Sequence, residues 1–169
     1  MSHPLVLGLF DTAAAAAAAA RDLRALGVPS ERVSIVARTH DEEGDVARAG
    51  GATPGSELED SRTAGRLGEL SAHFLAAVAV GVPGIGPIVA DGPLAAGLGE
   101  AAGHVGGGIV RTLEGAGVPR ADAEAFERQI ADGAILVGAH VDAGRAATAR
   151  DLLTRAGARA VAEGSWQER

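Results

Sequence analysis

The chain has 169 residues, of which 38 are Ala and 25 are Gly, and its net charge is −7. It contains no Cys, Lys, Tyr or Asn, which excludes thiol nucleophiles, disulfides, zinc–thiolate sites, phosphate-binding-loop lysines and Schiff-base chemistry. All 15 basic residues are Arg, and the acidic balance argues against nucleic acid as a partner. The length predicts a single domain over residues 1–169.

The first forty residues predict a strand, a helix and a second strand. An apolar run at Leu5–Phe10 is followed by an N-cap candidate at Asp11-Thr12 and by an alanine-rich segment of the highest helix propensity. Gly27 is a natural helix terminator, and Val33–Ala37 has the β-branched content of a short strand.

The same order recurs near the other end of the chain. Ile135–Val141 predicts a strand, an alanine-rich helix follows Asp142, and Gly157 precedes a short strand at Arg159–Ala162. Asp142 thus occupies the strand-to-helix junction that corresponds to Asp11 in the first unit.

Two βαβ units with four strands and two helices predict an α+β, ferredoxin-like sandwich with antiparallel strand order 4-1-3-2. Its core is expected from residues 1–39 and 134–164. The first and third strands are apolar at nearly every position, so both faces of the sheet should be covered, one of them by the two helices. The other face should be covered by the intervening residues or by a partner subunit.

The connection between the second and third strands is too long for a structureless loop. Residues 40–60 are acidic and rich in Gly, Pro and Ser, and predict a flexible linker. Residues 61–133 predict a Gly/Ala-rich helical insertion, with helix-like pieces at about 61–80 and 93–114 on either side of a breaker run at 81–87. An amphipathic helix is expected from Pro119 to Ile130.

Three stretches of this sequence are similar to the bacterial heat-induced and general stress proteins, a family of unknown biochemical function. They are VLGLFDTAAAAAAAARDLRALGVPSERVSIVAR, VPGIGPIVADGPLAAGLGEAAG and GVPRADAEAFERQIADGAILVGAHVDAGRAATARDLL. The resemblance implies a role in stress. It implies no catalytic residues, because that family has none established.

A repeated Glu-x-x-x-His pattern is the sharpest candidate site. Residues four apart share a helix face, so Glu69 with His73 and Glu100 with His104 could bind zinc or another divalent metal if their helices form an antiparallel hairpin. The plainer interpretation, which we favour, makes both pairs the polar faces of apolar helices. Apart from this speculative metal, no cofactor is expected.

Other sites are weaker. The glycine runs lack the strand, turn and helix context of a dinucleotide site, and no Ser lies in a Gly-x-Ser-x-Gly elbow. We interpret His140 as a packed sheet-face residue rather than a catalytic base. Residues 70–90 carry no formal charge, which allows membrane association, but prolines and glycines interrupt them and a buried helical hairpin is favoured.

The sequence therefore predicts a cytoplasmic, non-enzymatic structural or interaction protein induced by stress. Small side chains bury little area per residue, so we expect a homo-oligomer. One alternative is a sensor that binds a small ligand or a divalent metal through the insertion, and another is a membrane-associated stress protein.

Overall fold

The computed structural model describes residues 2–38, 70, 73, 77–101 and 108–167. Within these residues the protein is α+β, as predicted, with a six-stranded antiparallel sheet and five α-helices. In chain order the elements are β1 (Ser2–Phe10), α1 (Ala13–Ala25), the 3-10 turn η1 (Ser30–Arg32), β2 (Val33–Arg38), β3 (Val78–Val82), β4 (Gly86–Asp91), α4 (Pro93–Ala101), α5 (Gly108–Gly115), α6 (Arg120–Ala131), β5 (Ile135–His140), the 3-10 turn η2 (Ala143–Arg145), α7 (Ala146–Arg155) and β6 (Ala160–Gln167).

The strands lie in the order β3-β4-β2-β5-β1-β6, and every neighbouring pair is antiparallel. The four strands from the two repeated units are therefore adjacent, in the order fourth, first, third and second that the repeat predicts. β1 lies between β5 and β6, with Leu5 opposite both His140 and Gly164.

Residues 78–91 form a β-hairpin, so the expectation of a helix through residue 80 and of a helical hairpin around the breaker run is wrong. Pro83 and Gly84 make a tight turn, in which the Ile85 amide donates to the Val82 carbonyl at 3.1 Å and Gly84 has φ of +82°. Proline followed by a glycine with positive φ fits the central positions of a type II turn. The breaker run is thus the turn between two strands that extend the sheet.

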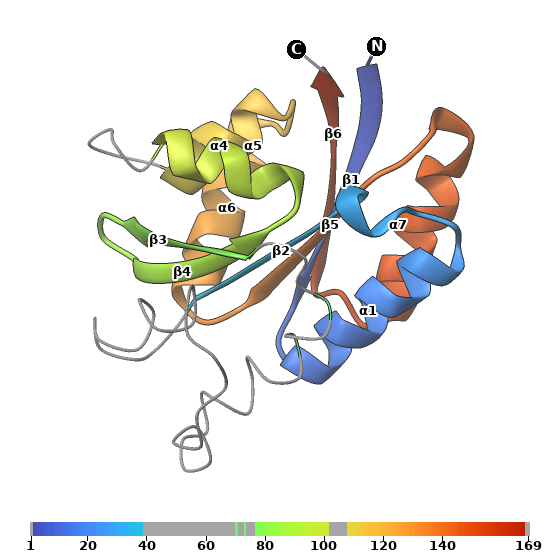
Figure 1. Ribbon diagram of the computed structural model, residues 1–169, viewed down its shortest axis with the longest axis horizontal. Coiled ribbons are helices and arrows are strands. Elements are labelled where there is room, and N and C mark those ends of the chain that lie inside the picture. The colour runs from blue at the N-terminus through green and yellow to red at the C-terminus, as the bar shows by residue number, and fades with distance from the viewer. Residues whose placement is uncertain (1, 39–69, 71–72, 74–76, 102–107, 168–169) are drawn as a thin grey trace.

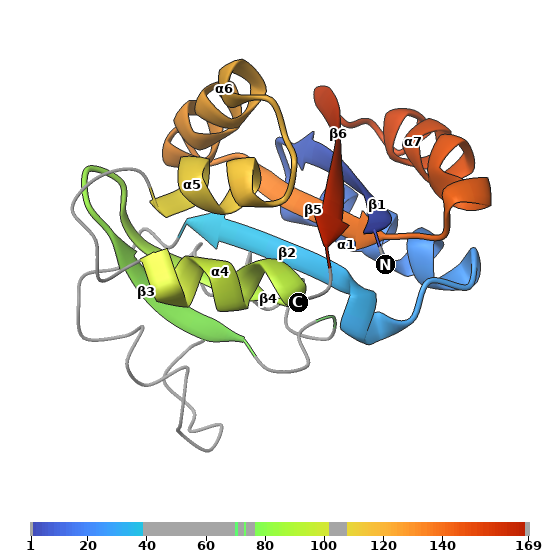
Figure 2. The same ribbon diagram turned by 90° about the horizontal axis from the view of Figure 1, so that it is seen from above.

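The helices cover both faces of the sheet (Figures 1 and 2). α1 and α7 pack on one face, where Val6, Phe10 and Leu23 are fully buried. α4, α5 and α6 pack on the other, around Leu5, Leu94 and other apolar side chains. Within the described residues, the face that the two repeated helices leave open is therefore covered by the chain's own intervening segment.

Polar contacts at buried positions attach α4 to the sheet. The Leu94 amide, in the first turn of α4, donates to Ser34 Oγ of β2 at 3.2 Å, and Ser34 is completely buried. Gly92 has φ of +80°, and a Cβ there would meet the Val33 carbonyl oxygen. The N-terminus of α5 is capped by α6, because the Val110 amide of α5 donates to a carboxylate oxygen of Glu127 in α6 at 3.1 Å. The carboxylate thus lies at the positive end of the α5 dipole.

In each of the two repeated units, the aspartate at the strand-to-helix junction pairs with an arginine of the other unit. Asp11 after β1 contacts Arg159 before β6 at 2.8 Å, and Asp142 after β5 contacts Arg32 before β2 at 3.6 Å. Two equivalent ion pairs thus connect the repeated units.

Among the helices of the described residues, none has the length and apolar content needed to cross a bilayer.

Candidate functional site

The structure describes two of the four residues that the sequence offers as metal ligands. Glu69 and His104 lie outside the described residues. His73 contacts Arg24 of α1, whereas Glu100 is an exposed residue of α4, and these two helices cover opposite faces of the sheet. The structure therefore does not bring His73 and Glu100 together. Its described residues contain no group of three or more His, Cys, Asp or Glu side chains arranged to hold a metal ion.

His73 is instead held by the last turn of α1. Arg24 Nη1 lies 2.6 Å from His73 Nδ1, and Arg24 Nη2 donates to the His73 carbonyl oxygen at 2.9 Å. Burial, together with the nearby charges of Arg24 and Arg21, lowers the pKa of His73 below 6.5. A neutral imidazole can accept a hydrogen bond from Arg24 Nη1 at Nδ1, and a protonated one cannot.

A histidine and the single tryptophan meet at one end of the sheet. His140 ends β5 and is 6% exposed, and its ring packs against Trp166 of β6 edge to face, with centroids 5.1 Å apart and planes at 74°. His3 of β1 is the cross-strand partner of Trp166. The sequence prediction of a sheet-face histidine agrees with this placement. The contact between His140 and Trp166 is not predicted, because the sequence places the end of the last strand at Ala162.

The space between the sheet and α4 is small and apolar. A cavity of about 10 Å³ is lined by side chains of β2, β5, α4 and α5, among them Leu94, Leu98 and Thr112. A space of this size holds roughly one water molecule. It does not fit a metabolite.

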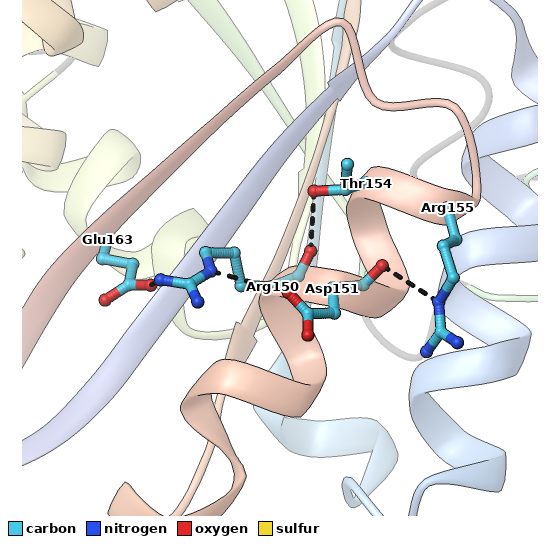
Figure 3. A network of polar contacts seen from close by, with 5 residues as sticks. All are labelled: Arg150, Asp151, Thr154, Arg155 and Glu163. Carbon is cyan, nitrogen blue, oxygen red and sulfur yellow. Dashed lines mark hydrogen bonds and ion pairs between the residues drawn. The ribbon is translucent and has the colours of Figure 1, made fainter.

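The sheet has two edges, and among the residues that the structure describes the chain covers one of them. The edge strand β6 is contacted by the loop between α5 and α6, because the Ser165 amide donates to the Ala116 carbonyl at 2.9 Å. Gly117 and Gly164 permit this approach, since a Cβ on either would meet the other segment's backbone. Figure 3 shows that Glu163, also on β6, is paired with Arg150 of α7, with 3.2 Å between the charged groups.

The opposite edge strand, β3, has a different character. All five of its residues are apolar or Gly, and within the described residues β4 is its one neighbouring strand. Val80 and Val82 reach the core beneath α4, whereas Val78 is 41% exposed and is the exposed large hydrophobic residue of the described part of the chain. An apolar strand with an open edge is a surface to which another strand can pair. We therefore take the β3 edge as the candidate functional site.

Functional sites are often recognised in a sequence by their charged residues, and β3 has none. The signal that could have found it is the alternation of valines at 78, 80 and 82 before a Pro-Gly turn. A comparison with protein-family models, with curated proteins and with solved structures found no match to this chain.

Proposed function

We propose that this chain is a non-enzymatic structural or interaction protein that works by associating with further copies of itself. The observation that carries the proposal is the apolar edge of β3, with Val78 41% exposed. Edge strands of native proteins are commonly guarded by charges, by proline or by covering loops. β6 follows this rule through Glu163 and the loop at Ala116, whereas β3 has no charge or proline, and none of the described segments covers its outer edge.

The composition supports the same conclusion. Ala supplies much of the core on the α1 face, where Ala13, Ala16 and Ala20 are buried. Each alanine removes little apolar area from water, and burial stabilises by roughly 25 cal/mol per Å². Association would add apolar contact to a fold that has few large side chains.

The proposed setting is bacterial stress in the cytoplasm, which is supported by the resemblance in sequence to heat-induced and general stress proteins. The proposed fold is a ferredoxin-like unit of β1, α1, β2, β5, α7 and β6, interrupted by the segment that carries β3, β4 and α4–α6. The strand order β6-β1-β5-β2 and the placement of α1 and α7 on one face support that description.

Sedimentation equilibrium of the purified chain tests self-association. We expect a dimer or larger species in the micromolar range, in reversible exchange with the monomer. A monomer that persists into the submillimolar range would refute the proposal. Protein abundance before and after heat shock in the organism of origin tests the stress role separately, and an unchanged level would count against it.

A further inference from the structure

The backbone of β3 presents a regular set of hydrogen-bonding groups at the edge of the sheet. In an antiparallel pair, opposite residues alternate between those that exchange two hydrogen bonds and those that exchange none. Gly81 is opposite Pro87, and proline has no N–H to donate. Val78, Val80 and Val82 are therefore the residues that exchange hydrogen bonds with β4. Ala79 and Gly81 direct their N–H and C=O groups away from β4, toward the outer edge.

The same reasoning applied to β6 agrees with a hydrogen bond that the structure shows. Pro4 of β1 is opposite Ser165, so the Ser165 amide must point to the outer edge of β6. It does so, and it donates to the Ala116 carbonyl. At β6 the outward amide of Ser165 is thus satisfied within the chain.

We propose that two copies of this chain pair through the outer edges of their β3 strands, antiparallel, about a two-fold axis at Val80. This inference rests on the proposed self-association and adds where it takes place. In this register Ala79 of one copy is opposite Gly81 of the other, and the outward N–H and C=O groups of both residues are satisfied in both copies. Val80 is then opposite its own counterpart, and the exposed Val78 is opposite the partner copy's Val82.

The occupant is a second copy because β3 is complementary to itself. Val78, Val80 and Val82 lie on the sheet face that carries α4, and a two-fold axis perpendicular to the sheet keeps both copies' valines on that one face. Ala79 and Gly81, on the other face, are small and do not obstruct the approach.

Charge favours the same edge. The chain carries a net charge of −7, so two copies repel each other in general. β3 has no charged residue, and its self-pairing places no like charges opposite each other. Self-pairing of β6 would bring Glu163 close to its own copy and would displace the loop at Ala116.

The extent of the edge sets the expected strength. β3 has five residues and spans about 17 Å, which is short for a permanent interface. We therefore expect a reversible dimer with a micromolar dissociation constant.

The test compares two substitutions at one exposed position. Ala79→Pro removes an N–H that points to the outer edge, so it leaves the hydrogen bonds to β4 intact and abolishes pairing. Ala79→Thr keeps that N–H and has a high strand propensity. In sedimentation equilibrium of the full chain, we expect the proline variant to dimerise at least about tenfold more weakly than the wild type. The threonine variant should match the wild type.

A third variant keeps the test decisive if the proline variant misfolds. Val78→Lys alters an exposed side chain and places a desolvated charge against the partner copy's Val82, so it should also weaken the dimer while its circular dichroism and thermal melt stay like those of the wild type. A wild-type dimer that survives both Ala79→Pro and Val78→Lys would overturn the β3 interface and leave self-association standing. A wild type that is monomeric throughout would overturn the proposed function itself.

Discussion

Replacing Leu94 by Ala should test whether the α4 face forms a true core. Leu94, in the first turn of α4, is completely buried and lines the small cavity between that helix and the strands β2 and β5. The substitution removes three carbon atoms, which costs about 2.4 kcal/mol at about 0.8 kcal/mol for each. A residual cavity of roughly 60 Å³, at about 24 cal/mol per Å³, adds about 1.5 kcal/mol.

The expected loss in the free energy of unfolding is therefore about 4 kcal/mol. The site has little freedom to collapse, because the facing strand presents Gly138, where a Cβ would already lie 2.7 Å from Leu7 Cδ2 and 3.6 Å from Leu94 Cδ1. Urea denaturation followed by circular dichroism measures the change. Ala96→Ser, at an exposed position of the same helix, is the matched control and should cost about 0.5 kcal/mol. A loss below about 1 kcal/mol for Leu94→Ala would refute the claim that α4 packs cooperatively on the sheet.

Three further predictions follow from single contacts. Gly92→Ala should destabilise the fold by about 2 kcal/mol or more in urea denaturation, because φ is +80° and the new Cβ meets the β2 backbone; an unchanged midpoint would contradict this. A double-mutant cycle of Asp11→Ala with Arg159→Ala should give a coupling of at most about 1 kcal/mol, since both side chains are largely exposed, and a larger value would show that the junction is more buried than described. Because folding lowers the pKa of His73 below 6.5, the unfolded chain binds more protons than the folded chain as the pH falls through 6.5, so the free energy of unfolding should decline as the pH is lowered through that value. His73→Gln, which keeps an acceptor for Arg24, should flatten that decline, and an equally steep profile in the variant would assign it to other groups.

The repeated outer units could be predicted because their signals are local. Gly27 and Gly157 end α1 and α7 with φ of +93° and +94°, as glycine at a helix C-terminus predicts. Thr12 caps α1 by accepting the Ala15 amide at 3.2 Å. The antiparallel order of the four strands in the repeated units, β6-β1-β5-β2, follows from the repeat itself.

The inner segment could not be predicted to the same extent, because its composition hides the periodicity. Val78–Val82 contains Ala and Gly between its valines, and this reads equally well as a small-residue helix. β6 extends five residues past its predicted end at Ala162, since Glu163–Gln167 pairs with the first residues of β1. That pairing is a long-range contact, and no local pattern in the polar C-terminal residues announces it.

The candidate site was missed for a related reason. Sequence patterns draw attention to charged and titratable residues, such as Glu69, His73, Glu100 and His104. Of these, the structure describes His73 and Glu100 and does not bring them together, and Glu69 and His104 lie outside the described residues. β3 carries no such residue. Which strand lies at an edge is decided by the whole sheet, and here the hairpin turn and the β2–β4 pairing place β3 outermost.

Amide hydrogen exchange at Ala79 and Gly81, measured as a function of protein concentration, tests the central claim most directly. Both amides point away from β4, toward the outer edge of β3, so they should exchange quickly in dilute solution and more slowly as the concentration rises. The Ser165 amide is the internal control, because it is bonded to the Ala116 carbonyl within the chain and should be protected equally at every concentration. Exchange at Ala79 and Gly81 that does not depend on concentration, in a sample shown to be dimeric, would contradict pairing through β3.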